Sequence, residues 1–173
     1  TDGGYVQNAS GWDIVFSDAY NNLLDFEIEQ YTSAPGGAKL VAWVRIPTLS
    51  NVASTTIFMR YGKTGVASSS ANPAGVWQSG FRGVWHLKED PSGAAPQMTD
   101  STAYLDHGSS VGGMTSANQV AGAIGGSLNF DNVDDQVAVP YSANLDVVGS
   151  ITLEAWVKTN NTDGNIVSKI GSA

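Results

Sequence analysis

The first half of the chain alternates apolar and polar residues with a period of two, which is the pattern of half-buried β-strands. Four stretches carry this pattern and are rich in β-branched or aromatic residues: 12–16, 24–31, 39–46 and 55–61. Turn-forming residues separate them, and Pro47 ends the third stretch. The pattern therefore predicts four strands joined by short turns.

The second half predicts further strands, after a segment of different composition. Residues 67–79 carry no charge and offer only one short helical turn, which Pro73 weakens. Beyond this segment, strands are predicted at 81–87, 127–130, 135–140, 150–159 and 166–170. The run Asp131-Asn132-Val133-Asp134 predicts a hairpin between the second and third of these. Many short strands without alternating helices predict an all-β fold, an antiparallel β-sandwich.

Composition and charge narrow the class of partner. The 173 residues include 16 acidic and 8 basic side chains, a net charge of −8, which argues against nucleic acid and anionic membranes as partners. No stretch approaches the roughly 20 apolar residues of a membrane span, so no membrane insertion is expected. The absence of cysteine excludes disulfides and thiol catalysis. A surface rich in Ser, Thr, Asn and Gly and poor in Lys predicts an extracellular location on a bacterial cell surface.

Several motifs in the first half resemble a known family. Trp-Asp-Ile-Val-Phe-Ser-Asp, Asp-Phe-Glu-Ile-Glu-Gln-Tyr, Val-Ala-Trp-Val-Arg-Ile-Pro and Thr-Ile-Phe-Met-Arg-Tyr lie within residues 12–61. With them, residues 5–80 resemble the domain-of-unknown-function 2341 family of bacterial surface proteins.

The second half resembles the N-terminal part of a laminin G-like, concanavalin A-like jelly roll. Gly-Val-Trp-His-Leu, Leu-Asn-Phe-Asp-Asn-Val-Asp-Asp-Gln-Val and Ile-Thr-Leu-Glu-Ala-Trp-Val-Lys carry this resemblance. It implies three parts, namely a β-rich module at 1–66, a connector at 67–80 and a partial jelly roll at 81–173. Both modules are shorter than the usual extent of their families. We therefore expect either that the two modules pack together or that neighbouring copies complete their edge strands in a homo-oligomer.

Three carboxylates are the candidates for catalysis. Asp25, Glu27 and Glu29 alternate along one predicted strand, so they face one side at a spacing of roughly 7 Å. Glycosidases place two carboxylates roughly 5 to 9.5 Å apart, which admits a glycoside hydrolase. The alternative is a solvated polar face opposite Phe26 and Ile28, and we expect no enzymatic activity.

Two acidic clusters are candidates for Ca²⁺, which binds six to eight oxygen ligands. The first contains Asp100, Ser101 and Asp106. The second is weaker and contains Asp131, Asp134 and their neighbours Asn132 and Asp135. The alternative for the second cluster is turn formation, because Asp and Asn side chains bond to their own backbone in turns.

Four of the five tryptophans and one histidine complete the candidates. Trp12 and Trp43 are expected to stack on sugar rings, whereas Trp85 and Trp156 are expected in the core. His86 is expected to be a strand histidine with satisfied hydrogen bonds.

Together these features predict a non-enzymatic, exported module for recognition or adhesion that binds carbohydrate, with a glycan or a surface protein as partner. The alternatives are a subunit of an extracellular filament and a glycoside hydrolase.

Overall fold

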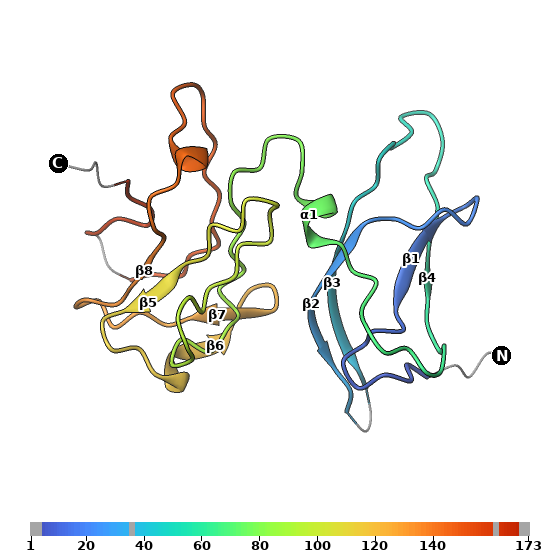
Figure 1. Cartoon of the computed structure of the whole chain (residues 1–173), viewed down its shortest axis with the longest axis horizontal. Coiled ribbons are helices and arrows are strands. Elements are labelled where there is room, and N and C mark those ends of the chain that lie inside the picture. The colour runs from blue at the N-terminus through green and yellow to red at the C-terminus, as the bar shows by residue number, and fades with distance from the viewer. Residues whose placement is uncertain (1–4, 35–36, 161–162, 170–173) are drawn as a thin grey trace.

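The computed structural model describes residues 5–34, 37–160 and 163–169. It confirms an all-β fold, in which the described strands form two-stranded antiparallel sheets (Figure 1). The strands are β1 Val15–Asp18, β2 Phe26–Thr32, β3 Lys39–Val44, β4 Ile57–Arg60, β5 Ser109–Val111, β6 Gln119–Ala121, β7 Gly126–Leu128 and β8 Gln136–Ala138. The helical turns are α1 Pro73–Val76 and the 3-10 turns Ser116–Asn118 and Ala143–Leu145. No helix among the described residues is long and apolar enough to cross a membrane.

The N-terminal block, residues 5–66, is a small sandwich of two sheets. β1 pairs with β4, and β2 pairs with β3. Phe16 of β1 and Phe26 of β2 meet edge to face with ring centroids 5.4 Å apart, and Ile14 and Leu24 complete the buried cluster between the sheets. The four strands predicted in this half of the chain are therefore confirmed, each within a few residues.

The C-terminal block, residues 81–169, has a smaller apolar core and more irregular backbone. β5 pairs with β8, and β6 pairs with β7. Met98, Met114 and Leu128 are its buried apolar cluster, with Trp85 packed against them. Figure 1 shows the two blocks side by side, with α1 lying between them.

The predicted hairpin around Asp131 is wrong. β7 and β8 flank this turn, but each pairs with an earlier strand, since Leu128 lies opposite Gln119 and Ala138 lies opposite Ser109. The turn thus joins strands of two different sheets. Alternation along a strand determines which face a side chain occupies, but it does not determine which strand is the partner.

Three other predicted strands are also corrected. Residues 81–87 contribute a single bridge, between Trp85 and Asp100. Residues 150–159 have a strand-like sequence but no strand structure, and Trp156, expected in the core, is 81% exposed. The predicted strand at 166–170 is absent from 166–169, and residue 170 lies outside the described residues. Because a strand forms only against a partner, an alternating sequence alone does not produce one.

Candidate functional site

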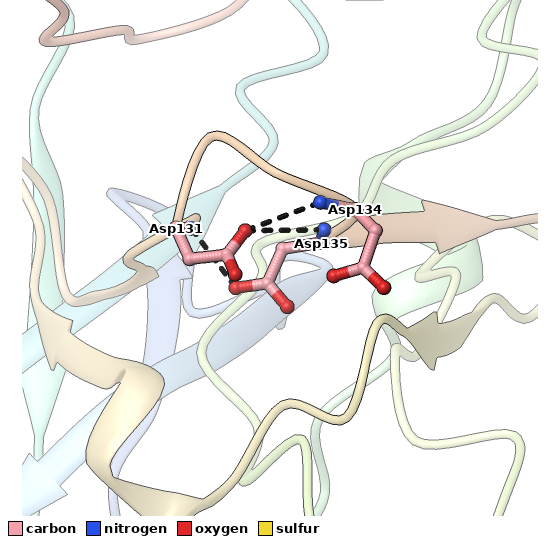
Figure 2. Close-up of side chains that lie close together, drawn as sticks. All are labelled: Asp131, Asp134 and Asp135. Atoms are coloured by element: carbon pink, nitrogen blue, oxygen red, sulfur yellow. Dashed lines mark hydrogen bonds between the residues drawn. The ribbon is translucent and has the colours of Figure 1, made fainter.

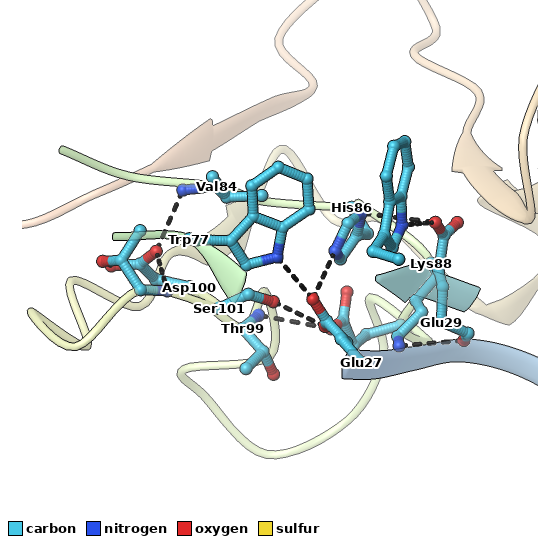
Figure 3. Close-up of polar contacts among 12 residues, drawn as sticks. Glu27, Glu29, Trp77, Val84, His86, Lys88, Thr99, Asp100 and Ser101 are labelled. Carbon is cyan, nitrogen blue, oxygen red and sulfur yellow. Dashed lines mark hydrogen bonds and ion pairs between the residues drawn. The ribbon is translucent and has the colours of Figure 1, made fainter. Parts of the chain in front are cut away.

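The two blocks meet at a buried polar cluster on β2. Phe26 points into the N-terminal core, whereas Glu27 and Glu29 point toward the C-terminal block, where each is only 6% exposed (Figure 3). A β-bulge between Ile28 and Gln30 interrupts the pairing of β2 with β3 at Glu29. We call this set of contacts the junction cluster; its members are Glu27, Glu29, Trp43, Trp77, His86 and Ser101.

Glu27 accepts hydrogen bonds from three parts of the chain. Its Oε2 accepts from Trp77 Nε1 at 2.6 Å and contacts His86 Nε2 at 3.1 Å, while its Oε1 accepts from the Ser101 hydroxyl at 2.7 Å. Both carboxylate oxygens are therefore committed to protein donors. This arrangement links β2 to the segment after α1 and to the C-terminal block.

Glu29 faces the other side of the same imidazole ring. Its Oε2 accepts from Trp43 Nε1 at 2.6 Å and lies 3.4 Å from His86 Nδ1. Only the doubly protonated ring presents an N–H to both carboxylates. The ring also stacks on Trp43, with centroids 5.7 Å apart, so the histidine is enclosed by two anions and an aromatic face.

The carboxyl group of Glu27 stays ionised despite its burial. Burial raises the pKa of Glu27, but hydrogen bonds from His86, Trp77 and Ser101, together with the positive charge of His86, lower this pKa below its ordinary value. The junction cluster is therefore a satisfied ionic network and not a solvated polar face, so that prediction is wrong for Glu27 and Glu29.

Asp25 lies apart from the other two predicted carboxylates. It precedes β2, accepts a hydrogen bond from Asn72 Nδ2 at 2.8 Å and lies 3.9 Å from Arg45. The three carboxylates that alternate in the sequence thus do not converge on one open surface.

Asp100, a predicted calcium ligand, organises a loop. It is 1% exposed, and its two carboxylate oxygens accept from the backbone N–H groups of Val84, Thr102 and Asp106 and from the Thr102 hydroxyl, at 2.8–3.0 Å. These four donors occupy the lone pairs that a metal would need. Ser101, next to it, points instead to Glu27.

Asp106, the other predicted ligand in this loop, lines a hollow of about 420 Å³ that we call the loop pocket. Asp106 Oδ2 accepts from Asn144 Nδ2 at 2.8 Å. His107 Nδ1 accepts from the Asp100 backbone N–H at 3.0 Å, which places the proton of the neutral ring on Nε2. Tyr141 lies on the pocket wall and is largely exposed. The lining residues are Ala95, Pro96, Leu105, Asp106, His107, Ser109, Pro140 and Tyr141.

Asp131, Asp134 and Asp135 bring their carboxylates together in an exposed turn (Figure 2). One ligand oxygen from each lies within 4.8 Å of the others. Asp131 also accepts from the backbone N–H groups of Val133, Asp134 and Asp135, and the Val133 bond in particular lowers the pKa of Asp131. The turn role predicted for these residues is thus present, and the spacing suits a cation as well.

The two tryptophans predicted to bind sugar differ in their surroundings. Trp12 is partly exposed on the N-terminal block. Trp43 is held inside the junction cluster between Trp77 and His86. The contacts of Trp77 and Ser101 with Glu27 were not predicted, since these residues lie 50 and 74 positions from Glu27 and no local pattern links them to it.

Comparison with known proteins finds a similarity to one family in the N-terminal part of the chain. Residues 10–87 match the family described as Domain of unknown function (DUF2341), which confirms the predicted resemblance there. The match runs through the predicted connector and includes all members of the junction cluster except Ser101. No curated protein and no solved structure matches the chain.

Proposed function

We propose that this protein is a non-enzymatic, exported recognition module that binds carbohydrate in the loop pocket of a laminin G-like C-terminal block. The observation that carries the proposal is the lining of this pocket, where free polar atoms lie beside an exposed aromatic ring. The volume of about 420 Å³ falls in the range of small-ligand pockets.

The chemistry of the lining suits a sugar. Among the described residues, Asp106 Oδ1 and His107 Nε2 have no hydrogen-bond partner, so one acceptor and one donor are available to neighbouring hydroxyls. The Tyr141 ring offers an apolar face for the C–H surface of a pyranose. A neutral sugar requires this combination, because its edge is polar and its face is apolar.

The junction cluster supports a non-enzymatic role. A glycosidase needs one carboxyl group to give up a proton and a second to attack or to activate water. Both oxygens of Glu27 are bound to protein donors, and Glu29 faces His86 and Trp43. These side chains are placed to join the two blocks.

A glycan array with the full chain tests the proposal. We expect binding to a defined set of neutral glycans, and at least tenfold weaker binding for Tyr141→Ala. Tyr20→Ala is the matched control, because Tyr20 is equally exposed but lies on the N-terminal block. An array without binding, or an unchanged affinity for Tyr141→Ala, would contradict the proposal.

A second candidate function is assembly through neighbouring copies. Residues 150–158 have a strand-like sequence but are not in a strand, and they expose Leu153 and Trp156. Pairing with a strand of another copy would satisfy the backbone N–H and C=O groups of this segment and bring the face that carries Trp156 against that copy. Sedimentation equilibrium tests this candidate: we expect association that increases with concentration and weakens in Trp156→Ser, but not in the control Val133→Ser. A monomer at all concentrations would rule it out.

A further inference from the structure

A second hollow, separate from the loop pocket, lies where the two blocks meet. This junction pocket has a volume of about 430 Å³. Residues of β2 and β3 line one side, and Lys88 and the β6–β7 hairpin line the other. Its principal lining residues are Glu29, Gln30, Lys39, Lys88, Gln119 and Gly125.

The junction pocket is lined by two positively charged side chains, although the protein as a whole is acidic. Lys39 and Lys88 both line it, although the chain carries only 8 basic residues against 16 acidic ones. Glu29 is the acidic residue in the lining, and its Oε2 already faces His86 and Trp43. Because the lining holds two ammonium groups against one carboxylate, the pocket is attractive to an anion.

The two ammonium groups are available to different degrees. Lys88 Nζ donates to the Glu29 backbone carbonyl at 2.9 Å and retains two further donors. Lys39 is exposed and has no hydrogen-bond or ion-pair partner among the described residues. The two oxygens of a ligand carboxylate could therefore accept hydrogen bonds from both blocks, one from Lys39 and one from Lys88.

One lining residue of the pocket, Gln30, also carries an unsatisfied acceptor. Gln30 Oε1 is buried and has no hydrogen-bond partner among the described residues. A buried acceptor without a donor is unfavourable, and Gln30 follows directly after the β-bulge that aims this part of β2 at the C-terminal block. A ligand hydroxyl would supply the missing donor once the Gln30 side chain turns toward the ligand.

The wall opposite β2 is tightly fitted. Gly125 has φ +57°, and a Cβ atom at this position would lie 1.9 Å from Glu29 Oε1. Only glycine allows the β6–β7 turn to approach Glu29 this closely. The pocket is thus formed by a specific docking of the two blocks.

We propose that the junction pocket binds a small hydroxylated carboxylic acid of the hexuronic acid class. The carboxylate pairs with Lys39 and Lys88, and a hydroxyl donates to Gln30 Oε1. The ligand contacts both blocks, so its binding also stabilises their relative position.

Isothermal titration of the full chain with sodium glucuronate tests this site, with glucose as the matched neutral sugar and sodium acetate as the matched simple anion. We expect glucuronate to bind, and glucose and acetate to bind at least tenfold more weakly. Lys39→Gln is expected to weaken glucuronate binding about tenfold, because one charge-assisted hydrogen bond is lost. Lys63→Gln is the control, since Lys63 is exposed outside the pocket.

The variants separate this site from the loop pocket. Lys39→Gln leaves neutral glycan binding unchanged, and Tyr141→Ala leaves glucuronate binding unchanged. Absence of glucuronate binding, equal binding of acetate, or full affinity in Lys39→Gln would overturn the proposal. None of these results would alter the test of the loop pocket.

Discussion

The two blocks of this protein hold their backbone in place by different means. In the N-terminal block, two sheets enclose Ile14, Phe16, Leu24 and Phe26. In the C-terminal block the strands are three residues long, and a buried carboxylate, Asp100, binds the loops around it. Apolar packing orders strands, whereas polar side chains order irregular backbone that has no ladder partner.

The largest effect is expected from a substitution that removes the apolar contact in the core of the N-terminal block. Phe26→Ala should lower the free energy of unfolding by about 4 kcal/mol, because the 2% exposed ring leaves a cavity beside Phe16. Urea unfolding followed by tryptophan fluorescence measures this loss. Phe58→Ala, at a half-exposed ring of β4, should cost less than about 1 kcal/mol. Equal losses would show that the core is not the main support of this block.

The next largest effect is expected from a substitution that removes the buried carboxylate of the C-terminal block. Asp100→Ala leaves four donors without an acceptor and should cost about 3 kcal/mol. Amide hydrogen exchange should show lost protection at Val84, Thr102 and Asp106. The exposed Asp134→Asn variant should keep the unfolding midpoint and the protection of these amides. Retained protection in Asp100→Ala would contradict the organising role of Asp100.

The third effect concerns the junction cluster that couples the blocks. The pKa of Glu27 lies below its ordinary value of 4.5, so the folded state binds the proton less readily than the unfolded state. The resulting stability is complete above pH of about 4.5 and is lost as the pH falls through the lower folded pKa. Glu27→Gln should cost about 2 kcal/mol at pH 7.

Urea midpoints measured from pH 7 to pH 3 test this coupling. The original chain should lose stability more steeply than Glu27→Gln in the acid range, because the variant lacks the titrating group. Glu154→Gln, at an exposed position, should follow the original chain. Parallel curves for the original chain and Glu27→Gln would show that the junction cluster does not depend on the charge of Glu27.

The smallest effect is expected from calcium, which would add to the stability that polar side chains give the C-terminal block. Calcium binding at Asp131, Asp134 and Asp135 should raise the melting temperature by about 2 °C at about 1 mM calcium. EDTA should reverse the rise, and Asp131→Asn combined with Asp134→Asn should abolish it. Asp106→Asn is the control at the other predicted cluster. A melting temperature that calcium does not change would leave these residues with their turn role alone.

The contrast between the blocks also explains which predictions were confirmed. In the N-terminal block, every strand-like sequence meets a partner, which is close by in the chain for β2 and β3 and distant for β1 and β4, so period-two alternation predicted the strands. In the C-terminal block, the Asp131 turn has the composition of a hairpin, yet β7 and β8 pair elsewhere. Residues 150–159 alternate as well and form no strand.

The candidate site also divides into features that the sequence predicted and features that it did not. The sequence placed Glu27 and Glu29 on one side of a strand, and both do leave the face that holds Phe26. It did not reveal that His86 enters between them, because that contact joins residues 59 positions apart. Asp100 and Asp106 likewise lie in one loop. The carboxylate of Asp100 accepts hydrogen bonds from backbone N–H groups, whereas Asp106 lines a pocket.

The amino-acid sequence alone predicted the all-β class, the strands of the N-terminal block and the resemblance of that block to a family, since these depend on local alternation, turn residues and motifs within short segments. The strand pairing, the buried carboxylates and the positions of the two pockets became known from the folded arrangement. Pairing, burial and charge compensation depend on groups brought together from distant parts of the chain, as Glu27, Trp77, His86 and Ser101 are at the junction.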